Sequence, residues 1–153
     1  MTVRRLGYRL AYRVLQVVWL VTRPSQQGVK CLLWHDGEIL LVRHAYGARD
    51  WDLPGGMVKR GEHPQDTAAR EMREELGIGA PRWADLGSVS TSIEHRRDTI
   101  HVFGAELVTA SVTIDRAELD VAQWFAPSEL PPMRPLGAQI LHHALPLVSS
   151  PTA

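Results

Sequence analysis

Short apolar runs separated by polar turns alternate along the chain, and this pattern predicts several β-strands. The runs at residues 29–34 and 38–44 are apolar enough for two neighbouring strands. Between them, Asp36 and Gly37 can supply the positive φ values that a tight hairpin turn needs. Three later runs have the same character, so we expect further strands at residues 83–90, 99–108 and 121–126.

Two segments have helical spacing instead. Pro64 suits the first turn of a helix, and Gly77 suits the position just past its end. The apolar stripe between them consists of Ala68, Ala69, Met72 and Leu76. A closing helix is expected at residues 136–145. Strands and helices in this order predict an α/β fold, with a mixed β-sheet that carries helices on its faces.

The first 27 residues contain arginines but no acidic residue. Residues 6–21 are expected to form a basic amphipathic helix, since Arg5, Arg9 and Arg13 lie four apart on one side. Pro24 ends this helix, and residues 25–28 are predicted to be a linker. A signal peptide is the alternative, but the apolar run 14–21 is too short to span a bilayer. We therefore divide the chain into residues 1–27, a domain at 28–149, and a tail at 150–153.

Composition and charge bear on the partners and the cellular compartment of this domain. The chain of 153 residues has a formal net charge of zero, so nothing indicates a specific nucleic-acid partner. Its single cysteine, Cys31, cannot form an internal disulfide and is expected to be a buried thiol, which fits a cytoplasmic protein. The tryptophans of the strand-like runs, Trp34, Trp83 and Trp124, are expected to pack in the core, and His142-His143 to lie on the surface.

The candidate chemistry lies between residues 56 and 78. Glu71, Glu74 and Glu75 are spaced i, i+3, i+4, so three carboxylates share one side of the predicted helix. Solvation or pairing with Arg70 and neighbouring Arg73 would be the ordinary explanation of such a cluster. A metal is the alternative, because Mg²⁺ prefers oxygen ligands and keeps waters that bridge to phosphates. The glycines at 55 and 56 would let a metal or a diphosphate approach the backbone closely.

The same segment resembles the signature of the Nudix hydrolases, G-x5-E-x7-R-E-U-x-E-E-x-G-U, where U is aliphatic. The matching residues are Gly56, Glu62, Arg70-Glu71-Met72, Glu74-Glu75 and Gly77-Ile78, with every spacing correct. A chance match in a chain of this size is on the order of 10⁻⁷ or below. The similarity extends loosely to residues 51–55 and to Trp124-Phe125.

This resemblance implies a Nudix fold, with the mixed sheet sandwiched between helices (α/β/α) and the N-terminal helix as an addition. It also implies a hydrolase that uses Mg²⁺, with Mn²⁺ as an alternative, and in which water attacks a phosphorus of a diphosphate linkage. Carried over by position, the metal ligands are Glu71, Glu74, Glu75 and the backbone carbonyl of Gly56. Arg70 and Glu62 would orient these ligands.

Other contributions lie outside this segment. Glu118, before Trp124-Phe125, is the best candidate for a further base or metal ligand, and Glu94 and Asp98 are alternatives. Candidate substrate-binding residues flank the glycines: Arg43 and Arg49 for phosphate, Tyr46 and Trp51 for stacking on a base, and Gly55 for close approach. His44 and the pair Arg96-Arg97, which is expected to interrupt two strands, are further alternatives for contact with the substrate.

Two classes of function remain open. The first is a diphosphohydrolase acting on a small nucleotide-like substrate, such as ADP-ribose, another nucleoside diphosphate sugar or a nucleoside triphosphate, with non-nucleotide diphosphates as a further alternative. The second is a catalytically silent Nudix-fold module that binds nucleotides or regulates. The complete set of glutamates favours the enzyme. A homodimer fits either class, and the N-terminal helix is expected to pack on the domain or in a dimer rather than on an anionic membrane.

Overall fold

The computed structural model describes residues 25–45, 49–79, 81–93 and 96–149. Residues 1–24, which include the expected N-terminal helix, lie outside this described part. The elements, in chain order, are β1 (Ser25–His35), β2 (Glu38–His44), α2 (Pro64–Leu76), β3 (Ala84–Ile93), β4 (Arg96–Glu106), β5 (Leu119–Phe125) and α3 (Pro135–Ser149). None of the helices in these described ranges is long and apolar enough to cross a membrane.

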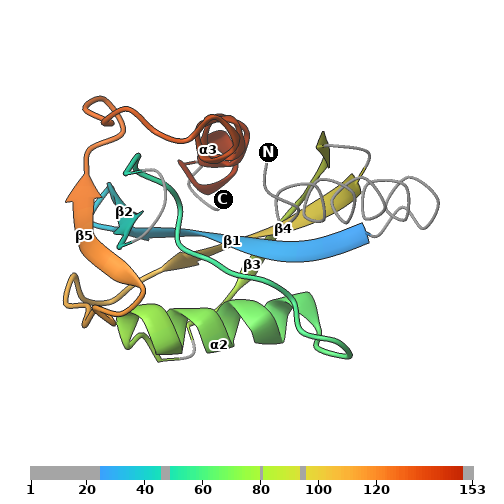
Figure 1. Ribbon diagram of the computed structural model, residues 1–153. Helices are drawn as coiled ribbons and strands as arrows, with labels where there is room; N and C mark the ends of the chain where they lie inside the picture. The colour runs from blue at the N-terminus through green and yellow to red at the C-terminus, as the bar shows by residue number, and fades with distance from the viewer. Residues whose placement is uncertain (1–24, 46–48, 80, 94–95, 150–153) are drawn as a thin grey trace, which may run out of the picture.

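The five strands form one sheet in the order β3-β4-β1-β2-β5. β1 and β4 are parallel, and the other neighbouring pairs are antiparallel, so the sheet is mixed as expected. α2 covers one face of the sheet and α3 covers the other (Figure 1). The predicted α/β/α arrangement is therefore confirmed.

The alternation of side chains along β1 divides the interior into two cores. Cys31 and Leu33 are fully buried on the α2 face, whereas Leu32 between them is fully buried on the α3 face. Burying such a leucine stabilises the fold by about 1.5–3 kcal/mol. Trp83 and Trp124 pack against the α2-side core and Trp34 against the α3-side core, as the sequence predicts.

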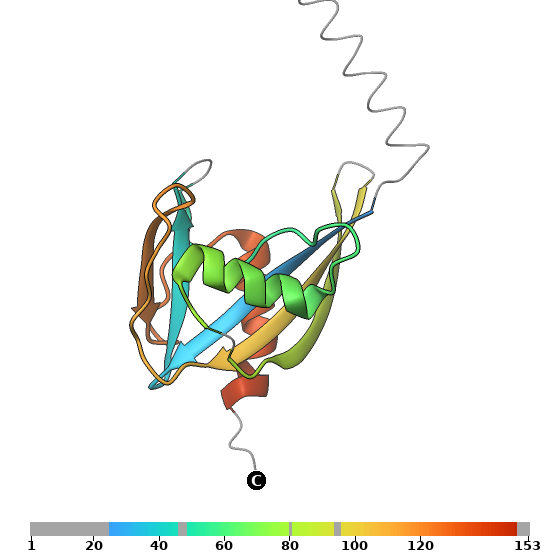
Figure 2. The ribbon, with the colours of Figure 1, turned by 90° about the horizontal axis from the view of Figure 1, so that it is seen from below.

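β1 and β2 pair directly only near their shared turn, at Trp34–Ile39 and His35–Glu38. Figure 2 shows the two strands diverging from there, with α2 lying across the opening. Residues 51–58, here called the inserted segment, fill the gap. Its carbonyls at Gly56 and Pro54 accept from the β1 amides of Val29 and Cys31, at 2.8 and 2.9 Å. Asp52 exchanges two backbone hydrogen bonds with Val42 of β2, both 2.9 Å.

The ends of α2 follow the predicted signals. Pro64 begins the helix after the N-cap His63, whose side chain accepts a hydrogen bond from the amide of Gln65. Gly77 ends it in the left-handed conformation, at φ 65°. The predicted hairpin turn is likewise present, with φ 48° at Asp36 and 80° at Gly37.

The structure corrects two predictions about the strands. Residues 25–28, predicted to be a linker, belong to β1, where Ser25 pairs with Arg97 of β4. Arg96 and Arg97, expected to interrupt two strands, belong to β4 and pair with Ile93 and Ser92 of β3. In both cases the partner strand supplies the backbone hydrogen bonds, which local sequence pattern does not reveal.

α3 also extends further than predicted, because it continues through Pro146 to Ser149. Proline removes one backbone donor from a helix and is normally unfavourable inside it. Here Leu145 and Val148 both pack against the α3-side core, and this tertiary contact holds the last turn. His142 and His143 are exposed on α3, as expected.

Candidate active site

Gly55 and Gly56 lie under α2, where no larger residue would fit. A Cβ at Gly55, whose φ is 152°, would collide with the backbone carbonyl of Val29. A Cβ at Gly56 would collide with the carboxylate of Glu71. The absent side chains therefore bring the backbone of the inserted segment against the acidic residues of α2.

Glu75 is the most deeply placed of these acids. Its residue surface is 3% exposed, and its Oε2 has no hydrogen-bond partner among the described residues. Burial, together with the charge of Glu71, raises the pKa of Glu75 to about 8. A hydrogen bond from the backbone of Gly55 acts in the opposite direction and is too weak to compensate. The charge of Lys30 also lowers the pKa of Glu75, but these effects do not offset the burial of this carboxyl.

Arg70 binds three carboxylates at the edge of this site. Its guanidinium holds Glu62 in a bidentate pair, with Nε–Oε1 at 2.8 Å and Nη2–Oε2 at 3.0 Å. Nη1 donates to Glu71 at 2.8 Å and to Glu74 at 3.1 Å. The bond from Arg70 lowers the pKa of Glu62 to about 2. Nη2 also reaches the carbonyl of Met57, at 3.3 Å, so Arg70 ties α2 to the inserted segment.

The three carboxylates that share one side of α2 do not converge on one point. Glu71 and Glu75 face the interior, whereas the side chain of Glu74 is 52% exposed and pairs with Arg70. In the part of the chain that the structure describes, no group of three acidic, histidine or cysteine side chains would enclose a metal ion. Arg70 currently occupies the position of a counter-charge for Glu71 and Glu74.

The donors nevertheless fit a hard divalent cation. Glu75 has an unpaired buried oxygen, and the carbonyl of Gly56 accepts one bond from Val29 and keeps a second lone pair. A cation beside Glu71 and Glu75 would supply the positive charge that their burial requires. The other ligands would be Glu74, after rotation away from Arg70, and water.

Glu118 approaches this site from the start of β5. Its side chain is exposed, and its charge is one of the causes that raise the pKa of Glu75. Its backbone carbonyl accepts from Ala45, at 3.0 Å, just after β2. Of the two alternatives, Glu94 lies outside the described residues, and Asp98 is partly buried in β4.

Two of the candidate substrate-binding residues, Arg43 and Trp51, lie against each other. Trp51 packs against the α3-side core, edge-on to Phe125 at 4.9 Å between ring centroids. Arg43 lies over its ring at 5.4 Å and also approaches Asp120, at 3.5 Å. Core packing, the alternative to base stacking, therefore describes Trp51. Arg49 is exposed, and Tyr46 lies outside the described residues.

His44 is the last residue of β2. Burial lowers its pKa, and the charges of Lys30 and Arg134 lower it further. Neutral histidine offers a nitrogen acceptor rather than a cation. The structure thus favours hydrogen bonding over phosphate attraction as the chemistry of His44.

Two residues that sequence reasoning did not assign are Lys30 and Asp52. Lys30 Nζ donates to Asp52 Oδ2 and to the carbonyl of Leu53, both at 2.8 Å. A lysine within the apolar run of β1 is the signal that could have identified this pair, because a buried ammonium requires an anionic partner.

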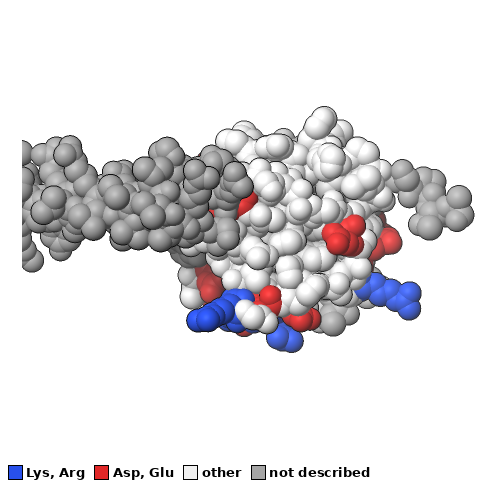
Figure 3. All heavy atoms as spheres, turned by 90° about the vertical axis from the view of Figure 1, so that its right-hand side faces the viewer, with Lys and Arg blue, Asp and Glu red and all other residues white. Residues whose placement is uncertain are grey.

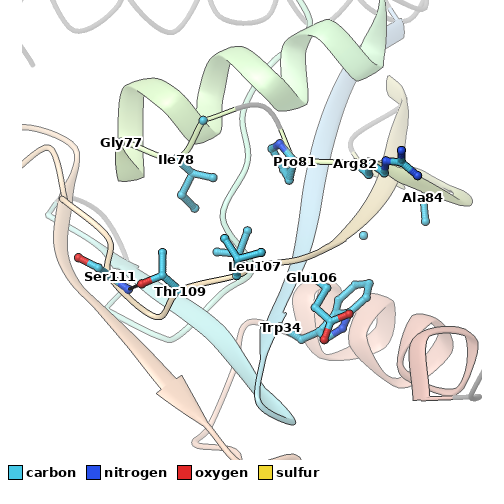
Figure 4. Close-up of a pocket in the computed structure, with 13 residues that line it drawn as sticks. Trp34, Gly77, Ile78, Pro81, Arg82, Ala84, Glu106, Leu107, Thr109 and Ser111 are labelled. Atoms are coloured by element: carbon cyan, nitrogen blue, oxygen red, sulfur yellow. Dashed lines mark hydrogen bonds between the residues drawn. The ribbon is translucent and has the colours of Figure 1, made fainter.

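A separate pocket of about 720 Å³ lies beyond the C-terminal end of α2, between the residues after Gly77 and the end of β4 (Figure 4). Trp34, Ile78, Pro81 and Leu107 line it, together with Arg82. Among the described residues, none of its lining belongs to the carboxylate site. The pocket is therefore not the place where the acids of α2 act.

Figure 3 shows the charges on one face of the molecule. Acidic and basic side chains are intermixed along its edge on the α2 side of the sheet, and most of the other described surface in this view is uncharged. This face therefore carries no broad field of one sign.

The chain is similar to known proteins both in sequence and in fold. The family model described as NUDIX domain matches residues 24–146. An ADP-ribose pyrophosphatase of Mycobacterium tuberculosis is 42% identical over 44% of this chain, which spans only 35% of that protein. A putative 8-oxo-dGTP diphosphatase of Bacillus subtilis is 29% identical over 69% of each chain. The crystal structure of a MutT NUDIX hydrolase from Burkholderia pseudomallei matches with a TM-score of 0.71 and 26% identity, over 78% of this chain and 98% of that one.

Proposed function

Since this chain belongs to the NUDIX domain family, we propose that it is a divalent-metal-dependent hydrolase that cleaves a diphosphate linkage in a small nucleotide-like substrate. The observation that carries the proposal is the buried carboxylate oxygen of Glu75 that has no hydrogen-bond partner among the described residues, beside Glu71 and the backbone of Gly55 and Gly56. A purely structural helix face would not bury two neighbouring acids without sufficient counter-charge.

Glu71, Glu74, Glu75 and the carbonyl of Gly56 would hold Mg²⁺ or Mn²⁺. The bound metal would supply positive charge that stabilises the phosphoryl oxygens and makes water a better nucleophile. Glu62 keeps Arg70 in place through its bidentate pair, and Arg70 in turn orients Glu71. Glu118 would accept a proton from the attacking water or complete the ligand set.

The test is the loss of one candidate metal ligand. We expect Glu75→Gln, and likewise Glu74→Gln, to lower turnover at least about a hundredfold, because each change removes charge and a ligand. Asp66→Asn is the matched control, since Asp66 is exposed in the first turn of the same helix. Activity that survives both glutamate changes, or that EDTA does not reduce, would contradict the metal assignment.

The same assay addresses the substrate. ADP-ribose and 8-oxo-dGTP are the first compounds to test, because the relatives described above are named for hydrolysis of these two. Product analysis for AMP with ribose 5-phosphate, or for a monophosphate with pyrophosphate, identifies the bond that is cleaved. If no compound in the panel is hydrolysed but one binds, the catalytically silent nucleotide-binding module replaces the hydrolase.

A further inference from the structure

The ion pair between Lys30 and Asp52 lies inside the molecule, where β1 meets the inserted segment. The side chains of Lys30 and Asp52 are 15% and 6% exposed. Lys30 also donates to the carbonyl of Leu53, and Asp52 Oδ1 accepts the amide of Leu53, at 2.8 Å each. Two charged groups are thus buried together, although replacing such a pair with apolar residues is often neutral or stabilising.

We infer that Lys30 and Asp52 are positioning residues that set the register of the inserted segment, and thereby hold Gly55 and Gly56 against the carboxylates of α2. The consequence for metal binding rests on the function proposed above. The consequence for register rests on the geometry of β1 and the inserted segment alone.

The backbone contacts of this segment do not specify a register by themselves. The carbonyls of Pro54 and Gly56 accept from Cys31 and Val29, but a shift by two residues would present other carbonyls to the same amides. Residues 53–56 contain one proline and two glycines, so few side chains are available to define the alignment. The ion pair does so, because the ammonium of Lys30 reaches Asp52 and Leu53 in this alignment.

A change of register would be incompatible with the candidate active site. A shift by two would place Pro54 or Val58 where Gly56 now lies. A Cβ at that position collides with the carboxylate of Glu71. The correct alignment is therefore a condition for the close approach of Glu71 to the segment's backbone.

α3, which lies on the face of the sheet opposite to α2, covers the same ion pair. A Cβ at Gly137 would collide with Asp52 Oδ1, so the first turn of α3 lies directly against this carboxylate. Backbone contacts also join the two parts, since the amide of Arg134 donates to the carbonyl of Trp51 at 2.8 Å. Asp52 is thus fixed by α3 and in turn fixes Lys30.

The test removes both charges together, so that neither is left buried alone. In the double variant Lys30→Met, Asp52→Asn, we expect hydrogen exchange at the amides of Val29 and Cys31 to become at least about tenfold faster. Amides of the β3–β4 ladder serve as internal reference. Titration with Mn²⁺ alone, followed by electron paramagnetic resonance of the free ion, should show affinity about 10- to 100-fold weaker.

Leu107→Ala is the matched control for lost stability. Leu107 is buried just after β4 and lines the separate pocket, whose lining includes no residue of the inserted segment, so its truncation leaves a cavity there. This variant should keep wild-type affinity for Mn²⁺. The single variant Lys30→Arg retains the charge, so it should keep part of the protection from exchange at Val29 and Cys31 that the double variant loses.

The outcomes separate the two proposals. Unchanged exchange at Val29 and Cys31 in the double variant overturns the role in register. Faster exchange with wild-type affinity for Mn²⁺ overturns the consequence of that register for the carboxylates of α2. Wild-type protein that does not bind Mn²⁺ contradicts the proposed function, while the exchange experiment still tests the register. If the double variant does not fold, Asp52→Asn alone carries the same measurements, because asparagine keeps the size of the side chain and one of its two acceptors, while Lys30 keeps the carbonyl of Leu53 as a partner.

Discussion

Glu75 is a buried carboxyl group, and its environment links its protonation to the stability of the fold. In the absence of metal, burial raises the pKa of Glu75 to about 8, whereas the ordinary value is 4.5. The folded protein therefore holds a proton on Glu75 that the unfolded chain releases once the pH passes the ordinary value. Because the unfolded chain then binds fewer protons, stability falls as the pH rises through this window.

We accordingly predict that the metal-free protein in EDTA has a lower Tm at pH 8 than at pH 5. Glu75→Gln should remove most of this decline, since glutamine does not ionise. Saturating Mg²⁺ should raise the Tm of the wild-type protein at pH 8 back to its value at pH 5. Thermal unfolding at several pH values measures all three effects. Equal slopes in the wild type and in Glu75→Gln would show that another group is responsible.

Among the elements, α2 and the inserted segment meet most closely at Gly56. Arg70 bonds the carbonyl of Met57, Gly55 donates to Glu75, and Gly56 faces Glu71. The helix and the segment come from one continuous stretch of chain, yet the sheet holds the segment and the core holds the helix. The spacing between them is therefore determined by packing on both sides.

Gly56→Ala tests this contact. We expect the added methyl group to displace Glu71, with a loss of stability of about 1–3 kcal/mol and a larger proportional loss of turnover. Gly79→Ala is the matched control, because a Cβ at Gly79 would meet nothing within 4 Å. Denaturant unfolding and steady-state kinetics on both variants provide the comparison. Wild-type kinetics in Gly56→Ala would mean that Glu71 needs no close approach to the segment.

At the scale of the whole molecule, charge is unevenly distributed along the chain. Residues 1–24 contain five arginines and no acid, whereas the chain as a whole has 17 basic and 17 acidic residues. The remainder therefore carries 12 basic and 17 acidic residues. This complementarity supports our proposal that the N-terminal segment packs on the domain or in a dimer, rather than on an anionic membrane.

A truncated chain that begins at Pro24 tests this proposal, and it keeps Ser25 and its pairing with Arg97. We predict a lower Tm or a changed oligomeric state, because the packed segment is lost. A chain that begins at Gly28 is the comparison, and it should be less stable still because it also lacks the first residues of β1. If removal of residues 1–23 alters neither Tm nor mass in solution, the packing proposal is wrong, and binding to anionic vesicles becomes the next measurement.

The sequence by itself determined the local elements and the chemistry of the candidate site. Apolar periodicity, Asp36-Gly37, Pro64 and Gly77 are local signals, so the hairpin and α2 could be located from neighbouring residues alone. The acidic residues of α2 were equally visible, because helical spacing places them on one side without reference to the rest of the fold.

Only the tertiary structure decided how these parts meet. The pairing of residues 25–28 with β4 and the insertion of residues 51–58 between β1 and β2 depend on partners distant in the sequence. The same is true of the burial of Glu75, the covering of Trp51 by Arg43, and the ion pair of Lys30 with Asp52. Burial and pairing are properties of the assembled environment, and periodicity along the chain does not contain them.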